Sequence, residues 1–262
     1  MTLLDGFVLL ATGIVVGLLN TLAGGGSFLS LPALIFVGLP PGIANGTNRV
    51  AILAQNISAV LGFHRHRVID WSWGWLAGLP TCLGTVLGTW LALETPDQLF
   101  RRLLAVFMVA FTLWTLFAKH PAPAGPVAPG EEGEAGQAVG LAALSLARRA
   151  VLVVGFFAAG IYGGFIQAGV GFLVLALTSL GGLDLVRGNA VKVFAIFLSM
   201  IVSLTGFLLA GRVEWLPGLA LGAGAVLGAA WGVRLSVAKG HRWIRAVVTA
   251  AVLACAVRLL LF

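Results

Sequence analysis

The sequence predicts an all-α membrane protein that crosses the bilayer several times and is built from two homologous halves. Apolar residues make up 60% of its 262 residues, and the mean hydropathy is +1.05. Charged residues make up only 10% of the chain, whereas a soluble domain carries about 25%. This composition excludes an ordinary soluble protein and predicts transmembrane helices.

A duplication with a period of 144 residues provides the second observation. The segment from Gly25 to Arg101 aligns without a gap with the segment 144 positions later. The identical pairs include Phe28 with Phe172, Gly38 with Gly182, Asn45 with Asn189, Gly62 with Gly206, Trp71 with Trp215, Gly74 with Gly218, Gly78 with Gly222, Gly84 with Gly228 and Gly88 with Gly232. Many secondary transporters consist of two copies of an apolar unit, with the substrate held between them.

Each copy opens with a long apolar stretch that is interrupted by glycines. The first stretch runs over Gly6–Gly38 around Gly24–Gly26, and the second runs over Val151–Gly182 around Gly169–Gly171. As a helix, Ser27–Gly38 would span only about 18 Å, short of the hydrocarbon core of about 30 Å. We therefore expect each stretch to form a broken helical hairpin whose glycine break faces protein or a watery cavity.

Three transmembrane helices follow each hairpin. The apolar runs that predict them are Ile43–Phe63, Trp73–Leu93 and Leu99–Ala118, then Arg187–Leu209, Leu216–Val237 and Trp243–Phe262. Between the copies, Lys119–Gln137 is rich in Pro, Ala, Gly and Glu, which predicts a flexible linker. The expected organisation is a first repeat at 1–118, a cytoplasmic linker at 119–147 and a second repeat at 148–262, together forming one transmembrane transport domain.

The basic residues favour inverted repeats. If each hairpin makes no net crossing, 11 of the 16 Lys and Arg residues fall on one side of the membrane and five on the other. If each opening stretch crosses once, the best division is nine against seven. The positive-inside rule favours the first arrangement, with both termini outside and the linker in the cytoplasm.

A polar stripe begins the helix after each hairpin, because positions three, four and seven residues apart share a helix face. The stripes comprise Asn45, Asn48 and Gln55 in the first copy and Asn189, Lys192 and Ser199 in the second. Polar groups inside apolar helices need partners or a cavity. A helix start adds about half a positive charge and unpaired N–H donors, which suits an anion.

These residues predict a binding site for a small anion near the middle of the membrane. The candidate residues are Asn45, Thr47, Asn48, Gln55, Asn189, Lys192 and Ser199, with the backbone of Gly25, Gly26 and Gly169; Asn20 and Gln167 are secondary candidates. The competing interpretation is that the Asn side chains only cap helix ends and bond between helices. Arg49 is the residue after Asn48, and its long side chain could instead snorkel to the outer interface.

Other functional classes find little support. The sequence contains no P-loop, no paired carboxylates and no Ser/His/Asp arrangement, so we expect no enzyme, cofactor or metal site. The net charge of +7 comes from basic residues in the short loops, which set the topology beside anionic lipid. It does not indicate binding to nucleic acid. Cys82 and Cys255 are expected to be packing residues. The glycines of Gly74–Gly88 and Gly218–Gly232 suit close helix packing, either within the chain or in a homodimer.

The sequence resembles the TauE/SafE sulfite-exporter family. The resemblance rests on Gly24–Pro32, Gly38–Pro41, Ala44–Asn48, the basic turn His64–Trp71 and Gly188–Lys192. It covers essentially the whole chain outside the linker. It implies transport of sulfite, sulfonates such as sulfoacetate, or other sulfur-containing anions across a bacterial inner membrane.

The expected function is therefore a secondary transporter for a small sulfur-containing anion that works by alternating access. Lys192 would supply charge, and Asn45, Thr47, Asn48 and Asn189 would supply hydrogen bonds. An anion channel is the alternative within the same class. A non-transporting assembly subunit or an intramembrane enzyme is the alternative from another class.

Overall fold

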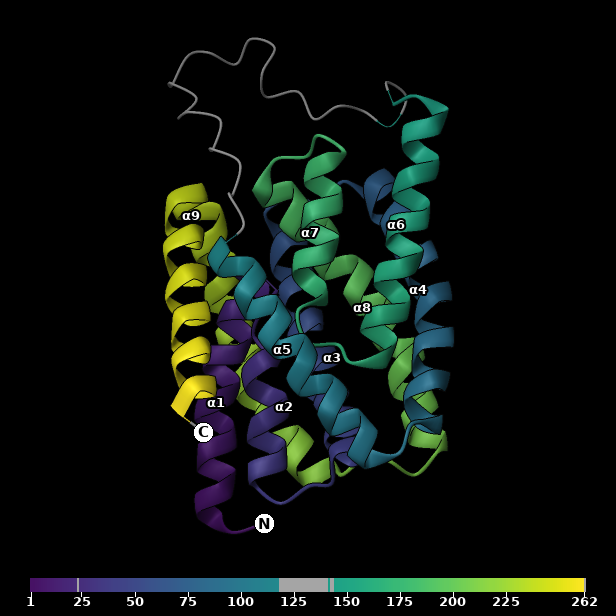
Figure 1. The fold of residues 1–262 in the computed structure, drawn as a ribbon. Coiled ribbons are helices and arrows are strands. Elements are labelled where there is room, and N and C mark those ends of the chain that lie inside the picture. Colours follow the sequence, from purple (N-terminus) through teal and green to yellow (C-terminus); the bar gives the residue numbers. More distant parts are fainter. Residues whose placement is uncertain (23, 118–140, 142–143, 262) are drawn as a thin grey trace.

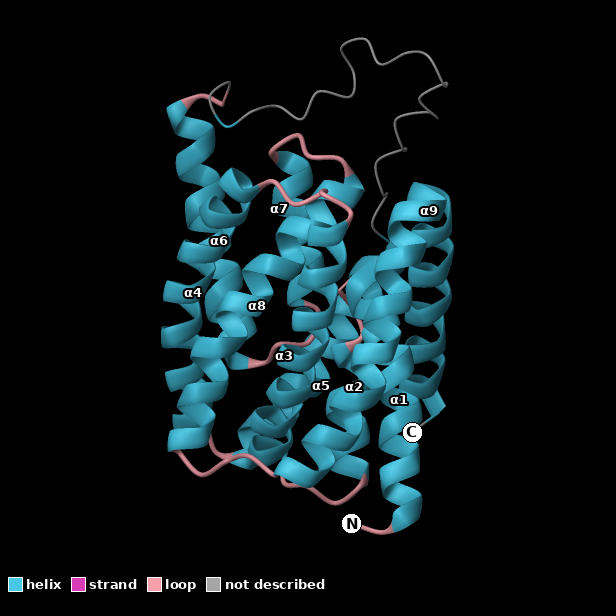
Figure 2. Ribbon diagram, turned by 180° about the vertical axis from the view of Figure 1, so that it is seen from behind, coloured by secondary structure: helices cyan, strands magenta, loops and turns pink. Residues whose placement is uncertain are grey.

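A computed structural model describes the backbone of residues 1–22, 24–117, 141 and 144–261 (Figure 1). Side chains are described for the same residues except 108–109, 111–117 and 239–261. The described part contains helices and no strand (Figure 2). The helices are α1 (Leu3–Leu22), α2 (Ser27–Phe36), α3 (Pro41–Arg65), α4 (Trp71–Glu94), α5 (Asp97–Phe117), α6 (Leu146–Phe165), α7 (Val170–Leu180), α8 (Leu185–Leu209) and α9 (Trp215–Leu261). The predicted all-α fold is confirmed.

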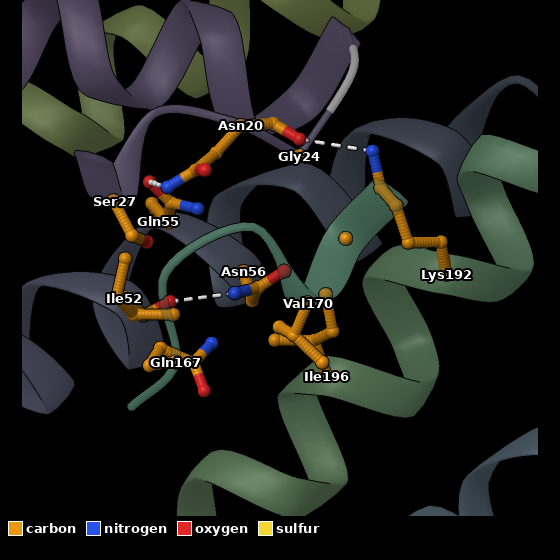
Figure 3. Close-up of a pocket in the computed structure, with 11 residues that line it drawn as sticks. Asn20, Gly24, Ser27, Ile52, Gln55, Asn56, Gln167, Val170, Lys192 and Ile196 are labelled. Atoms are coloured by element: carbon orange, nitrogen blue, oxygen red, sulfur yellow. Dashed lines mark hydrogen bonds between the residues drawn. The ribbon is translucent and has the colours of Figure 1, made fainter. Parts of the chain in front are cut away.

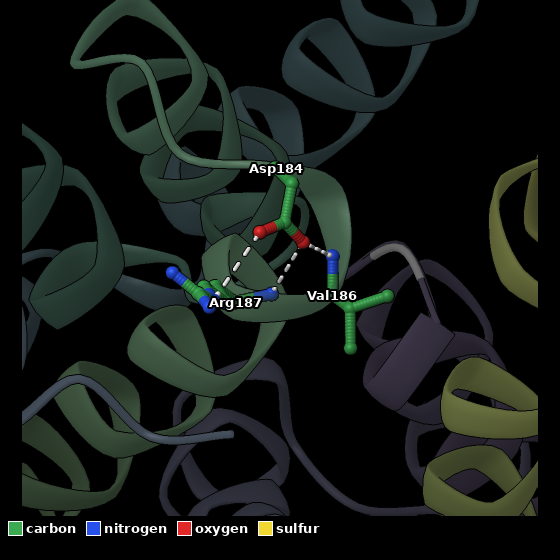
Figure 4. Close-up of polar contacts among 3 residues, drawn as sticks. All are labelled: Asp184, Val186 and Arg187. Atoms are coloured by element: carbon green, nitrogen blue, oxygen red, sulfur yellow. Dashed lines mark hydrogen bonds and ion pairs between the residues drawn. The ribbon is translucent and has the colours of Figure 1, made fainter. Parts of the chain in front are cut away.

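Capping residues explain why helices begin slightly before the apolar runs. Asp184 precedes α8, and its Oδ1 accepts hydrogen bonds from the backbone N–H groups of Val186 and Arg187 at 2.9 and 3.0 Å (Figure 4). Asp70 caps α4 in the same way by accepting from the N–H of Trp73. These carboxylates satisfy N–H groups that have no partner within the helix.

The glycine breaks occur where the sequence predicts them. Gly24 has φ +95° and Gly169 has φ +80°, a left-handed conformation that favours glycine. The helices that follow, α2 and α7, have only 10 and 11 residues. At about 1.5 Å per residue, neither crosses a hydrocarbon core of about 30 Å.

The two broken hairpins enter the bundle from opposite ends. In Figures 1 and 2, α1 and α2 occupy the lower part of the molecule, and α6 and α7 occupy the upper part. Each long helix and its short partner run antiparallel, so the breaks lie between the two ends. The short helices α2 and α7 both begin in the interior and run outward.

Five helices in the described part are long and apolar enough to cross a membrane. They are α1, α4, α6, α8 and the Trp215–Ala238 part of α9. Helices α3 and α5 occupy two further predicted spans. Polar residues lower the hydropathy of α3, and most side chains in the second half of α5 lie outside the described residues. The spans predicted at Leu216–Val237 and Trp243–Phe262 both fall on α9, whose helical backbone continues from one into the other. The predicted linker lies almost entirely outside the described residues, and α6 begins one residue before its expected end.

The two halves pack against each other through glycines, with matching contacts. A Cβ on Gly74 of α4 would lie 2.9 Å from the Phe194 ring of α8, and a Cβ on Gly218 of α9 would lie 3.1 Å from the Val50 Cβ of α3. Gly218 and Val50 occupy the positions equivalent to Gly74 and Phe194 under the 144-residue shift. Such reciprocal contacts are what a two-fold relation between two similar units produces.

Other glycines allow helix backbones to approach closely. A Cβ on Gly84 or Gly88 of α4 would lie 2.0 Å from a carbonyl oxygen of α6, and α1 and α9 have equivalent contacts. The predicted packing role of these glycines is therefore confirmed. Because helices of the same chain occupy these faces, the glycines need no second copy of the protein as a partner.

Candidate functional site

The two glycine breaks meet inside the bundle. A Cβ on Gly24 would lie 2.4 Å from the Cα of Gly171, and a Cβ on Gly171 would lie 2.4 Å from the Cα of Gly24. The break in α1–α2 therefore touches the break in α6–α7, backbone against backbone. Only residues without a side chain allow this contact.

A cavity lies beside this contact (Figure 3). The empty space between the lining atoms amounts to about 250 Å³ and includes space open to the outside. The walls are formed by Asn20, Gly24, Ser27, Ile52, Gln55, Asn56, Gln167, Val170, Gly171, Lys192 and Ile196. The space accessible to a solvent molecule is much smaller, and in this conformation it holds about one water. The cavity combines both hairpins with α3 and α8, which carry the predicted polar stripes.

The charge of the cavity is positive. Among the described lining residues Lys192 is the only ion, and none is acidic. The first residues of the short helices, Ser27 of α2 and Val170 of α7, also line it. Neither helix start is capped by a side chain. Two helix N-termini and an ammonium group make an environment that attracts an anion.

Amide side chains supply further hydrogen-bonding capacity. Asn20 of α1 donates to the Oε1 of Gln55 of α3 at 3.2 Å, and Asn56 donates to the carbonyl of Ile52. Gln167 has φ +69°, unusual for a residue with a side chain, and is 2% exposed. Its Oε1 is buried and has no hydrogen-bond partner. A buried amide oxygen without a donor at a cavity wall is what a bound water would satisfy.

Lys192 joins α8 to the end of α1. Its Nζ donates to the carbonyls of Asn20 and Thr21 at 2.9 and 3.2 Å, and to the Oδ1 of Asn189 at 2.7 Å. Asn189 in turn donates to the carbonyl of Leu22, the last residue of α1. The last carbonyls of a helix lack intrahelical partners, so this ammonium caps the C-terminus of α1.

Arg49 caps the C-terminus of α6 in the same way. Its guanidinium donates to the carbonyls of Gly163 and Gly164 at 3.2 and 2.6 Å, and to the Oδ1 of Asn45 at 3.3 Å. Asn45 donates to the carbonyl of Phe165, the last residue of α6. The arrangement mirrors that of Lys192 and Asn189, although Arg49 is one position beyond the equivalent of Lys192.

The suggestion that Arg49 snorkels to the interface is wrong. Its side chain is 0% exposed and lies 4.7 Å from the centre of the Phe207 ring. The carbonyls at the end of α6 hold the guanidinium inside the bundle. Nothing in the sequence around Arg49 indicates that this helix end lies next to it, because Gly163 and Gly164 are 114 and 115 positions away in the chain.

The structure brings some of the predicted site residues together and separates others. Gln55 and Lys192 line the cavity, as do the secondary candidates Asn20 and Gln167. Gly25 and Gly26 lie in the first break and Gly169 in the second. Asn45 and Asn189 are not among the residues that line the cavity. Each bonds to the helix end described above, which is the contact that the competing capping interpretation predicts.

Three further candidates lie away from the cavity walls. The Oγ1 of Thr47 accepts from the N–H of Glu214, just before α9, and the hydroxyl of Ser199 donates to the carbonyl of Ala195. Asn48 is 0% exposed, and both polar atoms of its side chain lack a partner. Sequence reasoning did not single out two cavity residues, Ser27 and Asn56. Ser27 could have been found from its place directly after the glycine break.

No group of three or more His, Cys, Asp or Glu residues that could hold a metal occurs among the described residues. The cavity offers neutral donors and acceptors, helix N-termini and one cation. Such a lining suits reversible binding of an anion, and it contains no nucleophile beside a general base.

Comparisons with known proteins agree with this architecture. The family model described as "Sulfite exporter TauE/SafE" matches residues 9–259. A "Probable membrane transporter protein" of Haemophilus influenzae is 31% identical over 242 residues, which cover 92% of this chain and 89% of that protein. The "Probable membrane transporter protein YfcA" of Escherichia coli K12 is 29% identical, covering 91% and 83%. "Probable membrane transporter protein ORF9" of Sinorhizobium is 28% identical, covering 96% and 91%. No solved structure shows a significant match.

Proposed function

Because the chain belongs to the TauE/SafE sulfite exporter family, we propose that it is a secondary transporter for a small sulfur-containing anion. Sulfite and short sulfonates such as sulfoacetate are the substrates we consider. The proposed setting is a bacterial inner membrane, which the chain crosses several times.

The central cavity is the observation that carries this proposal. It places the ammonium of Lys192 and the starts of α2 and α7 around one small space without an acidic side chain. Sulfite and sulfonates present three oxygens that accept hydrogen bonds. The amides of Asn20, Gln55 and Gln167 are suitable donors for them, and the positive ends of α2 and α7 favour their negative charge. A cation would find no carboxylate among the described lining residues.

The arrangement of the hairpins supports alternating access. We propose that the repeats are inverted across the membrane, because α1–α2 and α6–α7 enter the bundle from opposite ends (Figures 1 and 2). Movement of one half against the other would then expose the cavity first to one side and then to the other. Arg49 and Lys192 are buried inside the bundle, so neither lies in a loop that sets the topology. The count of basic residues assigned them to opposite sides of the membrane. Leaving both out therefore keeps the excess of basic residues on the same side.

A carrier fits the cavity better than an open channel. The cavity holds about one water in this conformation, so a sulfonate cannot pass without movement of the surrounding helices. A non-transporting subunit has no need of an internal cavity with a positive lining, since polar groups inside a membrane are costly.

Uptake of radiolabelled anions into proteoliposomes tests the proposal. Sulfoacetate and taurine are useful to compare, because both are sulfonates with two carbon atoms. Sulfoacetate ends in a carboxylate, whereas taurine ends in an ammonium group. We expect saturable uptake of sulfite or sulfoacetate and much weaker uptake of taurine, since the cavity already holds an ammonium. Sulfate and protein-free liposomes serve as controls. Folded protein that carries none of these anions at a saturable rate would overturn the proposal.

A further inference from the structure

The buried cations at the centre lack acidic partners. Lys192 is 1% exposed, and its three hydrogen bonds go to neutral oxygens. Arg49 is 0% exposed and bonds only to carbonyl and amide oxygens. The acidic residues of the described part lie at helix ends or beside them, at Asp5, Asp70, Glu94, Asp97, Asp184 and Glu214. Within that part, the one ion pair joins Arg187 to Asp184.

Helix dipoles do not remove this positive charge. The C-termini of α1 and α6 each contribute about half a negative charge next to Lys192 and Arg49. The N-termini of α2 and α7 contribute about half a positive charge each in the same region. These four contributions cancel, so the centre of the molecule retains the charge of two cations.

Closing such a site has different consequences with and without an anion. The three N–H donors of Lys192 are held by protein oxygens. While the cavity is open to one side, the water inside it screens the remaining positive charge. When the cavity closes, most of its water is displaced, and a cation without a counter-ion is strongly disfavoured in an apolar bundle. A bound anion supplies the missing counter-charge and makes closure favourable.

We infer that the protein is an exchanger, in which Lys192 makes the change between inward-open and outward-open states depend on a bound anion. This inference rests on the proposed transport function and deepens it. The loaded carrier passes through the closed state readily, whereas the unloaded carrier does so slowly. Exchange of one anion for another is then much faster than net movement in one direction.

Efflux from preloaded proteoliposomes tests the inference. Vesicles filled with radiolabelled sulfite or sulfoacetate are diluted into buffer with or without the same unlabelled anion outside. Potassium and valinomycin hold the membrane potential at zero, so that charge movement does not limit net efflux. We expect efflux into the anion-containing buffer to be faster by roughly tenfold or more. Without an external anion the carrier must close over the unpaired cation, and the free-energy cost of that closure adds to the activation barrier for its return.

Variants of Lys192 identify the residue responsible. In Lys192→Gln the ratio of exchange to net efflux should fall towards one, whereas Lys192→Arg keeps the charge and should keep the ratio high. Equal rates of exchange and net efflux in the unmodified protein would overturn the inference without any variant. So would an unchanged ratio in Lys192→Gln. If no efflux occurs either with or without the external anion, the proposed transport function is overturned, and this inference with it.

Discussion

Gly24 and Gly171 are in direct backbone contact, although 147 residues separate them in the sequence (171 − 24). Each belongs to a different half of the duplicated chain, and both line the central cavity. The contact holds the starts of α2 and α7 on either side of one small space. The geometry of the candidate site therefore depends on the absence of a side chain at these two positions.

Gly24→Ala should destabilise the protein and abolish transport. The new Cβ would lie 2.4 Å from the Cα of Gly171, so the two breaks must separate. Gly38→Ala is the matched control, because Gly38 also has positive φ, +102°, but no atom lies within 4 Å of its Cβ position. Both variants bear the backbone strain of about 1–2 kcal/mol, and Gly24→Ala adds about 1–3 kcal/mol for overpacking. Thermal unfolding in detergent compares them, and equal losses would contradict the close contact.

Gly88→Ala should lower the stability of the protein, whereas Gly222→Ala should not. Both positions are within helices, where alanine is favoured over glycine by up to about 1 kcal/mol. A Cβ at Gly88 would lie 2.0 Å from the carbonyl oxygen of Ile161, whereas at Gly222 the nearest atom is 3.4 Å away. We expect Gly88→Ala to lower the melting temperature and Gly222→Ala to leave it unchanged or raise it. The same outcome for both would show that α4 and α6 are not so closely packed.

Arg49→Lys should lower stability while leaving substrate affinity intact. Lysine cannot reproduce the paired donation of the guanidinium to the carbonyls of Gly163 and Gly164. We expect a loss of about 1–3 kcal/mol, the range for hydrogen bonds to a charged group. Arg187→Lys is the control, because Arg187 is exposed and forms a surface ion pair with Asp184, worth less than about 1 kcal/mol. A change in KM for the anion without a change in stability would place Arg49 in the binding site instead.

Gln55→Glu should prevent anion binding with almost no change in side-chain size. Gln55 lines the same cavity as Lys192, so the new carboxylate would be a built-in counter-ion. We expect the KM for sulfite or sulfoacetate to rise at least tenfold, equivalent to about 1.4 kcal/mol. Gln55→Leu, which removes the polar group without adding charge, should have a smaller effect. Equal effects of the two substitutions would mean that charge in this cavity does not control binding.

The local structure was largely predictable from the sequence. The positions of the two glycine breaks and the approximate bounds of α3, α4, α5 and α8 follow from apolar runs and glycine clusters. The helices extend a few residues beyond these runs where a polar residue caps them, as Asp184 does at α8. Hydropathy alone does not detect such caps, because they are polar residues outside the apolar run.

The partners of the polar residues were not predictable in the same way. The stripes containing Asn45 and Lys192 indicate a polar face, but not the helix that this face meets. In the structure they meet the C-termini of α6 and α1, each contributed by the opposite half. Arg49 was misinterpreted for the same reason, since its buried position depends on carbonyls at Gly163 and Gly164. Periodicity within one helix contains no information on contacts between segments that are more than 100 residues apart.

The central claim is that an anion binds beside Lys192 between the two glycine breaks. Isothermal titration of the purified protein with sulfite and sulfoacetate tests it most directly, in the unmodified protein and in Lys192→Gln. We predict that the substitution weakens binding by about 1–3 kcal/mol, or roughly 5- to 150-fold, because it removes the positive charge beside the anion. Unchanged affinity in a folded Lys192→Gln protein would contradict the claim and remove Lys192 from the binding site.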